Sequence, residues 1–544
     1  MLKKLLIANR GEIAIRIART ASDMGIKTVS VFSGDDHLSL HTRHSESAVN
    51  LGQNGVAAYL NAENILEIAK ETGCDAVHPG YGFLSESAGF AALCVKEGIQ
   101  FVGPSEATLS QFGDKAQARS LAIANEVPVL QGTNQATSLE EAKAFYNSLG
   151  SGAAVMIKAL AGGGGRGMRP VRKESDLEEA YARATSEAEK SFGSGELYLE
   201  EMLYPARHVE VQIVGDGDRV VHLWDRECSL QRQRQKLVEI APAFGLSDEL
   251  RGSMLESAQR IALAANYHGV GTIEFLVGTE GEDADRFVFM EANARLQVEH
   301  TVTEEVTGLD LVALQLRLAG GESLNEIALT QELIGSSKGV AVQVRINLEK
   351  MNEDGTSVPG GGTLSSYEPP SGPGIRLDGF GYNGYSTSLL YDSLLAKLIV
   401  HSDELERAIL RTRRALSEFK IEGAHTNIAF LQSILKNSPI AESGIHTLFV
   451  EENIVDLLAT EEEPGRYFVP PEKELQMAGS QVDPDDPLAV LALKGPAVQS
   501  KAQETEATQI AGPSGTVSIP APLQGMLIEF SVAVGDEVKK NQPV

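Results

Sequence analysis

Two carboxylates stand inside neighbouring apolar stretches of the sequence. Glu274 lies in GTIEFLVG (271–278), Glu291 lies in RFVFMEAN (286–293), and an acidic segment separates them. The alternation predicts two strands of a hairpin, and the two-residue period places Asn293 on the same face as Glu291. Oxygen ligands on adjacent strands suit a Mg²⁺ ion that bridges nucleotide phosphates. The alternative, two solvated strand faces, is weaker because apolar residues surround both carboxylates.

A cation, an amide and a carboxylate alternate directly after these strands. They are Arg295, Gln297 and Glu299 in ARLQVEH (294–300), and an extended backbone would put all three on one face. Arg295 could then bind a small planar anion while Glu299 acts as a general base. A surface ladder of salt bridges is the competing interpretation. His300 is assigned a structural role, because a lone histidine more often satisfies a hydrogen bond.

A run of glycines, Gly162–Gly167, follows a predicted strand at 154–160 that contains Lys158. Glycines let backbone N–H groups approach phosphate oxygens without Cβ clashes, and Lys158 can add charge to the same anion. The run is not a Walker A loop, because no Gly-Lys-Ser/Thr follows it, and it is not a dinucleotide-binding fingerprint. It indicates a phosphate-binding loop, with a surface loop as the alternative.

Basic residues are grouped at 229–236, where Arg232, Arg234 and Lys236 stand beside two glutamines. So local a basic group in an acidic chain suggests a bound anion, although a solvated charge run explains it almost as well. Arg345 differs because it lies inside the apolar strand-like run VAVQVRIN. A guanidinium in such a strand needs a partner, and a functional role fits it.

Alternating strands and helices must position these residues. The opening of the chain predicts strands at 3–8 and 27–32 with an amphipathic helix between them. Further strand-like runs lie at 75–78 and 99–102. This order predicts a doubly wound, mostly parallel sheet. Many unrelated enzymes begin in the same way, so the pattern indicates a fold and not a function.

The character of the sequence changes at about 130. A strand at 154–160, a polar helix at 174–192 and a strand at 196–203 predict a small inserted α+β domain, and 205–450 predicts a larger α+β region. After about 465 the composition shifts towards Pro, Asp, Gln and Ala, which is typical of a flexible connector. Short alternating strands return after it and predict a small β module.

Composition excludes several classes of protein. The chain has 544 residues, enough for several domains, and 42% apolar with 22% charged residues argues against wholesale disorder. No apolar run approaches the roughly 20 residues that cross a bilayer, and LLIA near the start is too short for a signal peptide. Three cysteines without metal-like spacing fit a reducing compartment. A net charge of −28 disfavours general nucleic-acid binding.

Taken in chain order, nine segments resemble the biotin carboxylase family of ATP-grasp enzymes. The resemblance covers about residues 1–450 and is specific because it is an ordered set. The segments are IANRGEIAIRI (7–17), HPGYGFLSE (78–86), FVGPS…GDK (101–115), MIKALAGGGGRGM (156–168), RHVEVQI (207–213), DRECSLQ (225–231), EFL (274–276), FMEANARLQVEHTVTE (289–304) and YDSLLAKL (391–398).

The resemblance implies an α/β and α+β multidomain chain. Its parts would be a doubly wound parallel sheet, an ATP-grasp region with a Gly-rich lid, a C-terminal α+β region and part of an all-β biotinyl domain. The expected boundaries are 1–113 for the N-terminal domain, 114–204 for the ATP-grasp region with its lid at about 132–204, 205–450 for the rest of the ATP-grasp and the C-terminal domain, 451–515 for a linker and 516–544 for the start of a biotinyl carrier domain.

The last segment also indicates a subtype. It resembles the first half of a biotinyl carrier domain and stops before the lysine that would carry biotin. Only about 65 residues separate it from the carboxylase region. Pyruvate and urea carboxylases usually place a carboxyltransferase region in this gap. Direct succession instead resembles acyl-CoA carboxylases, either an α-subunit or a single-chain enzyme.

By resemblance, each candidate residue receives a role. Glu299 would deprotonate bicarbonate and Arg345 would stabilise the biotin enolate, with Lys236 and Arg295 also at the reacting groups. Glu274, Glu291 and Asn293 would hold Mg²⁺ or Mn²⁺. Bicarbonate would contact Lys236, Arg295, Gln297 and Val298. ATP would be held by Lys115, Lys158, Gly162, Gly163, Gly164, Gly165, Gly167, Glu200, Leu203, His208 and Gln231.

The implied reaction is the ATP- and bicarbonate-dependent carboxylation of biotin N1′ through carboxyphosphate. Phosphoryl transfer of this kind needs positioning and charge neutralisation more than covalent help. The implied partners are a biotinyl carrier, a carboxyltransferase region or subunit and a second copy of the chain. Neither nucleic acid nor membrane is expected, and the expected location is the cytoplasm or an organelle matrix.

Two positions depart from the family pattern. Arg234 stands where the family usually has histidine before Gln-Lys, so a fixed charge replaces a titratable ring. Glu201 follows Glu200 at a hinge where some relatives carry lysine. We expect both side chains to face the nucleotide, where they would alter ATP affinity without excluding activity.

Two other functions stay open. Another ATP-grasp ligase, of the carbamoyl-phosphate synthase or purine-pathway type, would lack the biotinyl-like tail and the segments HPGYGFLSE and ARLQVEH. An inactive scaffold that only docks a carrier would have no need for the charged set. That set is Lys115, Lys158, Glu274, Glu291, Glu299 and Arg345.

Overall fold

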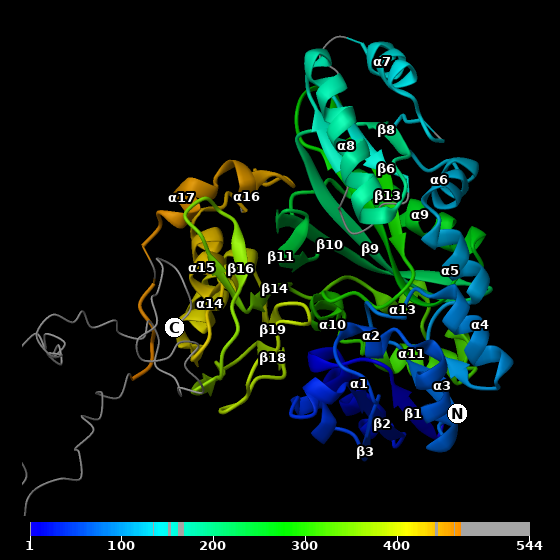
Figure 1. Ribbon diagram of the computed structural model, residues 1–544, viewed down its shortest axis with the longest axis vertical. Coiled ribbons are helices and arrows are strands. Elements are labelled where there is room, and N and C mark those ends of the chain that lie inside the picture. The colour runs from blue at the N-terminus through cyan, green and yellow to red at the C-terminus, as the bar shows by residue number, and fades with distance from the viewer. Residues whose placement is uncertain are drawn as a thin grey trace, which may run out of the picture. The chain divides into compact units, whose positions relative to one another are not determined.

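The computed structural model describes residues 2–468 except 134, 151–153, 161–167, 441–443 and 462 (Figure 1). The predicted phosphate-binding loop, the biotinyl segment at 516–544 and most of the predicted linker lie outside the described residues. Within the described residues, no helix has the length and apolar character needed to cross a membrane.

The N-terminal region forms a parallel sheet in the order β3-β2-β1-β4-β5. Successive residues of β1 point to opposite faces: Leu6 packs with the core under α3 and α4, whereas Leu5 and Ile7 pack with the core under α1 and α11. Helices therefore cover both faces, and the predicted doubly wound sheet is confirmed. The elements are β1 (Lys4–Ile7), α1 (Gly11–Asp23), β2 (Lys27–Phe32), β3 (Ser47–Asn50), α2 (Val56–Tyr59), α3 (Ala62–Glu71), β4 (Ala76–His78), α4 (Ala88–Lys96) and β5 (Gln100–Phe101).

A small three-stranded antiparallel sheet, in the order β7-β6-β8, follows the helices α5 and α6. It packs against α7 and α8 around a core of its own that includes Val155, Leu199 and Ala184. This unit agrees with the predicted inserted α+β domain. The elements are α5 (Glu106–Gly113), α6 (Lys115–Ala124), α7 (Leu139–Ser148), β6 (Val155–Ala159), β7 (Met168–Val171), α8 (Leu177–Phe192) and β8 (Leu197–Glu201).

An eight-stranded antiparallel sheet, in the order β13-β12-β9-β10-β11-β14-β19-β18, runs through the rest of the described chain. One core packs β9 and β12 against α9, and a second packs β11, β14 and β19 against α14 and α15. The elements are β9 (Ala206–Asp216), β10 (Val220–Arg232), β11 (Gln235–Ala241), α9 (Asp248–Ala264), β12 (His268–Gly278), β13 (Phe287–Asn293), α10 (His300–Thr307), α11 (Leu311–Ala319), β14 (Val340–Asn347), β18 (Ile375–Gly379), β19 (Leu394–Ser402), α14 (Leu405–Glu418) and α15 (Ile428–Asn437).

Short elements complete the region: α12 (Leu324–Ile327), α13 (Gln331–Ile334), β15 (Glu349–Met351), β16 (Ser357–Pro359), β17 (Ser366–Glu368), β20 (Lys420–Glu422), α16 (Phe449–Glu452) and α17 (Ile454–Leu458). Helix α17 lies inside the stretch predicted as linker (451–515). Leu457 is buried in the second core, so the packed chain continues beyond the expected boundary at 450. The apolar residues of 454–458 find a surface to cover, which a composition-based boundary does not detect.

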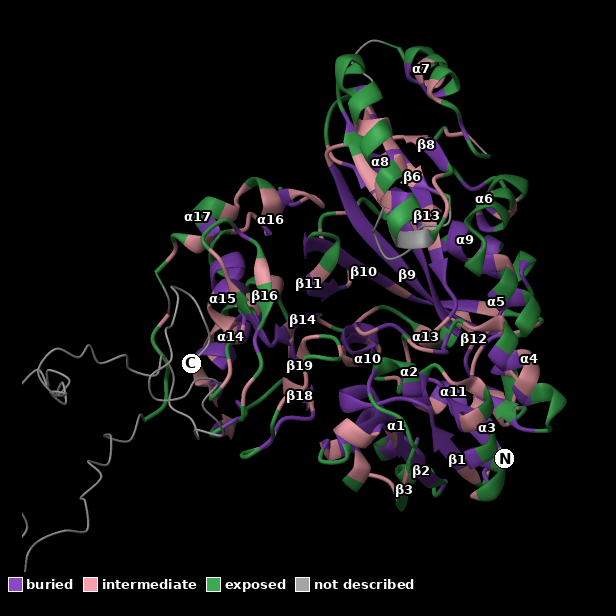
Figure 2. Ribbon diagram, viewed as in Figure 1, coloured by how far each residue is buried: buried purple, intermediate pink, exposed green. Residues whose placement is uncertain are grey.

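Burial follows the central strands of the large sheet (Figure 2). Every residue from Ala206 to Gly215 in β9 is buried, including His208, Glu210 and Gln212. Buried charged and polar groups require partners, because desolvation without compensation is costly. The partners of these side chains define the candidate site.

Candidate active site

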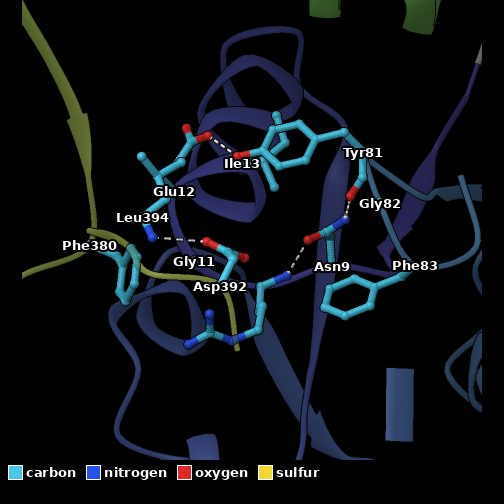
Figure 3. A pocket seen from close by; sticks show the side chains of 11 residues that line it. Asn9, Gly11, Glu12, Ile13, Tyr81, Gly82, Phe83, Phe380, Asp392 and Leu394 are labelled. Atoms are coloured by element: carbon cyan, nitrogen blue, oxygen red, sulfur yellow. Dashed lines mark hydrogen bonds between the residues drawn. The ribbon is translucent and has the colours of Figure 1, made fainter. Parts of the chain in front are cut away.

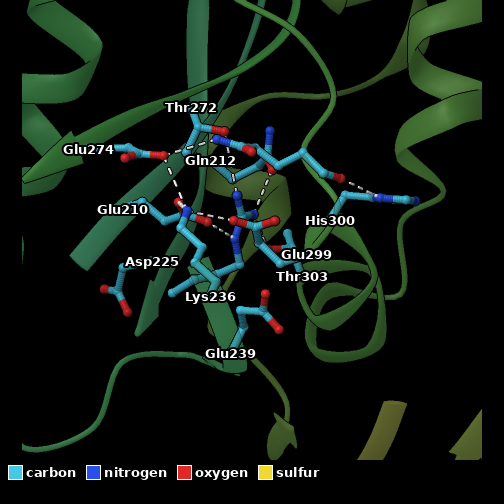
Figure 4. A network of polar contacts seen from close by, with 12 residues as sticks. Glu210, Gln212, Asp225, Lys236, Glu239, Thr272, Glu274, Glu299, His300 and Thr303 are labelled. Atoms are coloured by element: carbon cyan, nitrogen blue, oxygen red, sulfur yellow. Dashed lines mark hydrogen bonds and ion pairs between the residues drawn. The ribbon is translucent and has the colours of Figure 1, made fainter. Parts of the chain in front are cut away.

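Lys236 lies at the centre of a group of buried carboxylates (Figure 4). Its Nζ is 2.6 Å from Glu210, 2.6 Å from Glu299 and 3.2 Å from Glu274. Glu210 and Glu274 are direct partners across β9 and β12, so their side chains share one face of the sheet. We call these four residues the Lys236 cluster. Burial works to lower the pKa of Lys236, but the surrounding carboxylates raise it well above its usual value and keep the ammonium charged.

Glu299 contacts two cations, Lys236 and Arg345. It is completely buried, and its second oxygen accepts a 3.0 Å hydrogen bond from Arg345 Nη2. Burial works to raise the pKa of Glu299, but Lys236 and Arg345 outweigh it and hold that pKa well below the usual range. Glu299 is therefore an unprotonated proton acceptor between two cations. Arg345 is anchored on its other side by Glu239, which is also buried.

The predicted metal ligands are brought together as the hairpin pattern implied. Glu274 and Glu291 are direct partners across β12 and β13, and Asn293 donates to both, at 2.8 Å and 3.5 Å. His208 Nε2 lies 2.9 Å from the second oxygen of Glu274. Burial raises the pKa of Glu291 and the Glu274 charge raises it further, so a divalent cation between them would relieve the repulsion. The residues thus fit a hard, oxygen-binding cation such as Mg²⁺.

Two other groups of ligand-type side chains meet nearby, His208 with Glu210 and Glu274, and Glu210 with Cys228 and Glu299. Each group brings its ligand atoms within 4.8 Å of one another. The Lys236 ammonium already contacts carboxylates of both groups and supplies their positive charge. Glu291 belongs to neither group and is the direct partner of Glu274 across β12 and β13, so these two carboxylates stay the candidate pair for a metal.

The segment that contains Arg295, Gln297 and Glu299 is not an extended strand. Residues 294–299 are irregular and turn at Val298 and Glu299 into α10. The three side chains nevertheless converge: Arg295 donates to Gln297 at 2.9 Å, and Gln297 donates to Glu274 at 3.0 Å. A turn held by tertiary contacts, and not a two-residue period, brings these groups together.

Arg295 is a partly exposed cation at this group. It donates to Asn293 at 3.0 Å and to the half-exposed Glu86 at 3.0 Å. The Glu86 contact ties the segment to the N-terminal region. Since Glu86 is accessible, an anion can compete with it for Arg295 more easily than with the buried carboxylates.

The residues expected to contact ATP are spread over several elements. Lys158 and Glu200 lie on the neighbouring strands β6 and β8 and form an ion pair. Lys115 opens α6, and its charge lowers the pKa of Glu291, opposing the effect of burial. Gln231 is buried opposite Lys236 in the β10–β11 ladder. Leu203 belongs to a small apolar core with Leu130, Ala206 and Val288.

The basic run at 229–236 does not form a single cluster. Arg232 is buried and donates to Glu349 at 2.6 Å, whereas Lys236 points into the Lys236 cluster. Between them, Gln233 and Arg234 have φ values of 48° and 65° and form the tight turn between β10 and β11. Lys236 pairs with Gln231 and Arg232 pairs with Gln235, so Arg232 and Lys236 lie on opposite faces of the hairpin.

Glu201 faces an arginine. Its carboxylate accepts two hydrogen bonds from Arg286, at 2.8 Å and 3.0 Å, and one from the backbone of Gln131 at 3.2 Å. These contacts lower the pKa of Glu201, the Arg286 hydrogen bonds being the largest cause. The pair joins the end of β8 to the residue before β13, and β13 carries Glu291.

Sequence reasoning missed several buried charged residues. Glu210 and Glu239 lie inside apolar strands, whereas Arg226 stands between two acidic residues of β10, donates to Gln212 at 2.6 Å and pairs with Glu210. Glu210 and Glu239 follow the same rule as Arg345, because a charge inside an apolar strand needs a partner. The partners themselves come from distant strands and leave no local signal.

Three family models match the chain in order. They are the biotin carboxylase N-terminal domain at residues 1–109, the ATP-binding domain of the carbamoyl-phosphate synthase L chain at 114–327 and the biotin carboxylase C-terminal domain at 343–452. A solved biotin carboxylase domain, that of the Hydrogenobacter thermophilus 2-oxoglutarate carboxylase, is 39% identical and superimposes with a TM-score of 0.79. The match covers 85% of this chain and all of that domain. The chain belongs to the biotin carboxylase family.

The relatives of this biotin carboxylase differ in the larger enzymes to which they belong. The Staphylococcus aureus pyruvate carboxylase is 45% identical over 83% of this chain and 39% of its own length. A single-chain, multi-domain long-chain acyl-CoA carboxylase is 41% identical, with a TM-score of 0.73, over 86% of this chain and 44% of that one. The chain thus spans about two fifths of these enzymes. The Hydrogenobacter domain is a dimer in complex with ADP, magnesium and bicarbonate.

Proposed function

We propose that this chain carboxylates biotin N1′ with ATP and bicarbonate, through carboxyphosphate. The observation that carries the proposal is the position of Glu299, a buried, unprotonated carboxylate between Lys236 and Arg345. Glu274 shares the Lys236 ammonium with Glu299, and Glu291 is the partner of Glu274 on the adjacent strand. A proton acceptor, anion-binding cations and a candidate metal site thus share one buried volume.

On the nucleotide side, Lys115, Lys158 and the glycine run would bind the ATP phosphates, together with Glu200, Leu203, His208 and Gln231. Glu274 and Glu291, with Asn293 beside them, would hold Mg²⁺ or Mn²⁺, which neutralises phosphate charge when bound. Lys158 pairs with Glu200 at the base of β6 and β8, so phosphate would compete with Glu200 for its ammonium. The ammonium of Lys158 and the carboxylate of Glu200 would then both lie close to the nucleotide.

On the bicarbonate side, Lys236, Arg295, Gln297 and the Val298 backbone would hold the anion against Glu299. The carboxylate takes the bicarbonate proton, and the freed oxygen attacks the γ-phosphorus as ADP leaves. Bicarbonate placed among these cations would weaken their hold on Glu299 and raise its pKa towards that of a working base. The resulting carboxyphosphate divides into CO₂ and phosphate.

Phosphate then accepts the N1′ proton of biotin, and the N1′ nitrogen forms the new bond to CO₂. Arg345 would stabilise the negative charge that develops on the ureido oxygen of biotin. It is suited to this role because Glu239 anchors its Nε while Nη2 reaches Glu299. The guanidinium is thereby oriented before biotin arrives, which lowers the cost of reorganisation.

The partners belong to the same proposal. We propose a biotinyl carrier and a carboxyltransferase region or subunit as functional partners, and a homodimer as the assembly. We further propose the acyl-CoA carboxylase subtype, because the carrier-like segment follows the carboxylase region after about 65 residues. The likeness to the single-chain acyl-CoA carboxylase supports it. The pyruvate carboxylase relatives define the alternative, which a coupled assay of acyl-CoA against pyruvate carboxylation would separate.

The test of the half-reaction is ATP hydrolysis by the full 544-residue chain with magnesium and free biotin. We expect hydrolysis that requires bicarbonate and that biotin stimulates. A folded sample that binds ATP but shows neither dependence would contradict the proposal. Ammonia-dependent hydrolysis would instead support a ligase of the carbamoyl-phosphate synthase type.

A further inference from the structure

Lys397 is a fully buried lysine that the proposed chemistry does not use. It lies in the middle of β19, directly opposite Arg345 of β14, so both side chains share the face of the sheet that carries the Lys236 cluster. A buried ammonium requires both a counter-ion and hydrogen-bond acceptors. The counter-ion and the hydrogen-bond acceptor of Lys397 come from two different regions of the chain.

The acceptor belongs to the turn before α10. Lys397 Nζ donates to the carbonyl of Val298 at 3.0 Å, across 99 positions in the sequence. The neighbouring carbonyls, those of Gln297 and Glu299, accept from backbone N–H groups of α10 itself. The carbonyl of Val298 is therefore the one of the three that a distant strand holds, and it belongs to the peptide unit that leads into Glu299.

The counter-ion belongs to the N-terminal region. Lys397 Nζ lies 3.1 Å from Glu12 Oε2, in the first turn of α1, and Glu12 is itself buried. Tyr81 donates its hydroxyl hydrogen to the other oxygen of Glu12. Glu12 and Tyr81 line a cavity of about 120 Å³ together with Phe83, Phe380 and Asp392 (Figure 3).

We propose that Lys397 is a positioning residue for the general base, holding the Val298–Glu299 peptide in the orientation that places Glu299 against Lys236. This inference rests on the proposed function and assigns to it a residue outside the reacting groups. Lys397 contacts Glu12 of α1 and the carbonyl of Val298, so α1 and the turn that carries the base meet at one side chain. A displacement of a reacting group by about 1 Å can cost on the order of 100-fold in rate.

The alternative is that the Lys397–Glu12 pair only joins α1 to the large sheet. The double variant Lys397→Met/Glu12→Gln separates the two roles in the full chain, because it leaves no unpaired buried charge but also no donor for Val298. The reference is the single variant Lys397→Met. If the role is only structural, the double variant should regain both melting temperature and activity relative to that reference. If Lys397 positions the base, melting temperature should recover and activity should not.

Two readouts apply to this variant. Amide hydrogen exchange of the peptide covering 294–300 should become about tenfold faster, and kcat/KM for bicarbonate should fall about 10- to 100-fold, with the KM for ATP within about twofold of wild type. Lys420→Met is the matched control, since Lys420 is also buried and pairs with Glu368 and Glu422 away from the turn. Its exchange at 294–300 should equal that of wild type.

Glu12→Gln gives an independent comparison should the double variant not fold, because it keeps the Lys397 donor. Exchange at 294–300 should then stay close to wild type, and an increase equal to that of Lys397→Met would overturn the proposal. A folded double variant with wild-type exchange and activity would overturn it as well. Absence of bicarbonate-dependent hydrolysis in the wild type would contradict the proposed function, while the exchange comparison would still decide the role of Lys397.

Discussion

The two large sheets of this protein use their faces differently. In the parallel N-terminal sheet, Leu5, Leu6 and Ile7 are all buried among apolar residues, and helices cover both faces. In the antiparallel sheet, Val209 and Val211 of β9 face a core, whereas the alternate residues His208 and Glu210 face the site. A sheet with two apolar faces can offer polar groups only at its strand ends, whereas one with a polar face can present them from the middle of several strands.

This difference explains how the candidate site is built. Adjacent antiparallel strands place Glu210, Glu274 and Glu291 side by side on one face, with Lys236 and Arg345 two and three strands away. The backbone ladder holds all of these positions without loops. Preorganised charges of this kind need little reorganisation when a substrate binds.

The largest effect expected is on turnover. Glu299→Gln keeps the size of the side chain but removes the proton acceptor, so biotin-stimulated hydrolysis should fall about 10²–10⁴-fold while ATP binding stays near normal. Steady-state kinetics with a direct ATP-binding measurement checks this. Glu305→Gln is the control, since Glu305 is a neighbouring carboxylate that contacts Arg376 and not Lys236. Near-normal turnover of Glu299→Gln would show that the base is elsewhere.

Removing the shared cation should give the unfolding free energy a pH dependence opposite in sign to the one that Glu299 gives the wild type. Lys236→Met leaves Glu210, Glu274 and Glu299 buried without their common ammonium and should cost about 3–5 kcal/mol of unfolding free energy at pH 7. In the wild type the lowered pKa of Glu299 stabilises the fold above the unfolded value of 4.5, and that contribution is lost as pH falls below it. In the variant the uncompensated carboxylates gain raised pKa values, so this deficit should shrink as pH falls from 7 to 5.

Urea unfolding at several pH values measures both slopes. The double variant Glu210→Gln/Lys236→Met is the control, because it removes one carboxylate together with the cation and should recover part of the loss. A deficit that stays constant between pH 7 and 5 would mean that the three carboxylates are not coupled through Lys236.

The apolar face should respond in a different way. Leu6→Ala in the parallel sheet removes a fully buried side chain and should cost about 2–5 kcal/mol through lost burial and the cavity left behind. The cost should show no dependence on pH between 5 and 7, because Leu6 packs in an apolar core and its replacement changes no charge. Unfolding measured at both pH values, together with KM for ATP, checks this. A clear change in KM would show that this sheet is coupled to the site.

The smallest effect is expected at the hinge. Glu201→Gln weakens the partly exposed pair with Arg286 and should cost less than about 1 kcal/mol of stability. Because the pair joins β8 to the strand that carries Glu291, the KM for ATP should change by about two- to threefold. Glu179→Gln, in an exposed pair with Arg183 on α8, is the control and should leave the KM for ATP unchanged. Equal KM values for ATP in both variants would show that Glu201 has no role at the nucleotide site.

Local patterns in the sequence predicted much of this arrangement. The hairpin with Glu274 and Glu291 and the ion-paired Arg345 both follow from the patterns of single strands. The shape of the 294–299 turn, the separation of Arg232 from Lys236 and the roles of Glu210 and Glu239 could not be predicted in that way. They depend on which strands are neighbours in the sheet, and a chain pattern does not encode those neighbours.

The sequence by itself determined the order of the elements, the parallel N-terminal sheet, the residue types able to bind phosphate, metal and anion, and the resemblance to biotin carboxylases. Only the tertiary structure decided that one ammonium serves three carboxylates, and that Lys397 reaches across 99 positions to the turn before Glu299. The reason is physical. Periodicity reports which face a side chain occupies, whereas the energy of a buried charge depends on the partners that folding brings within about 3 Å.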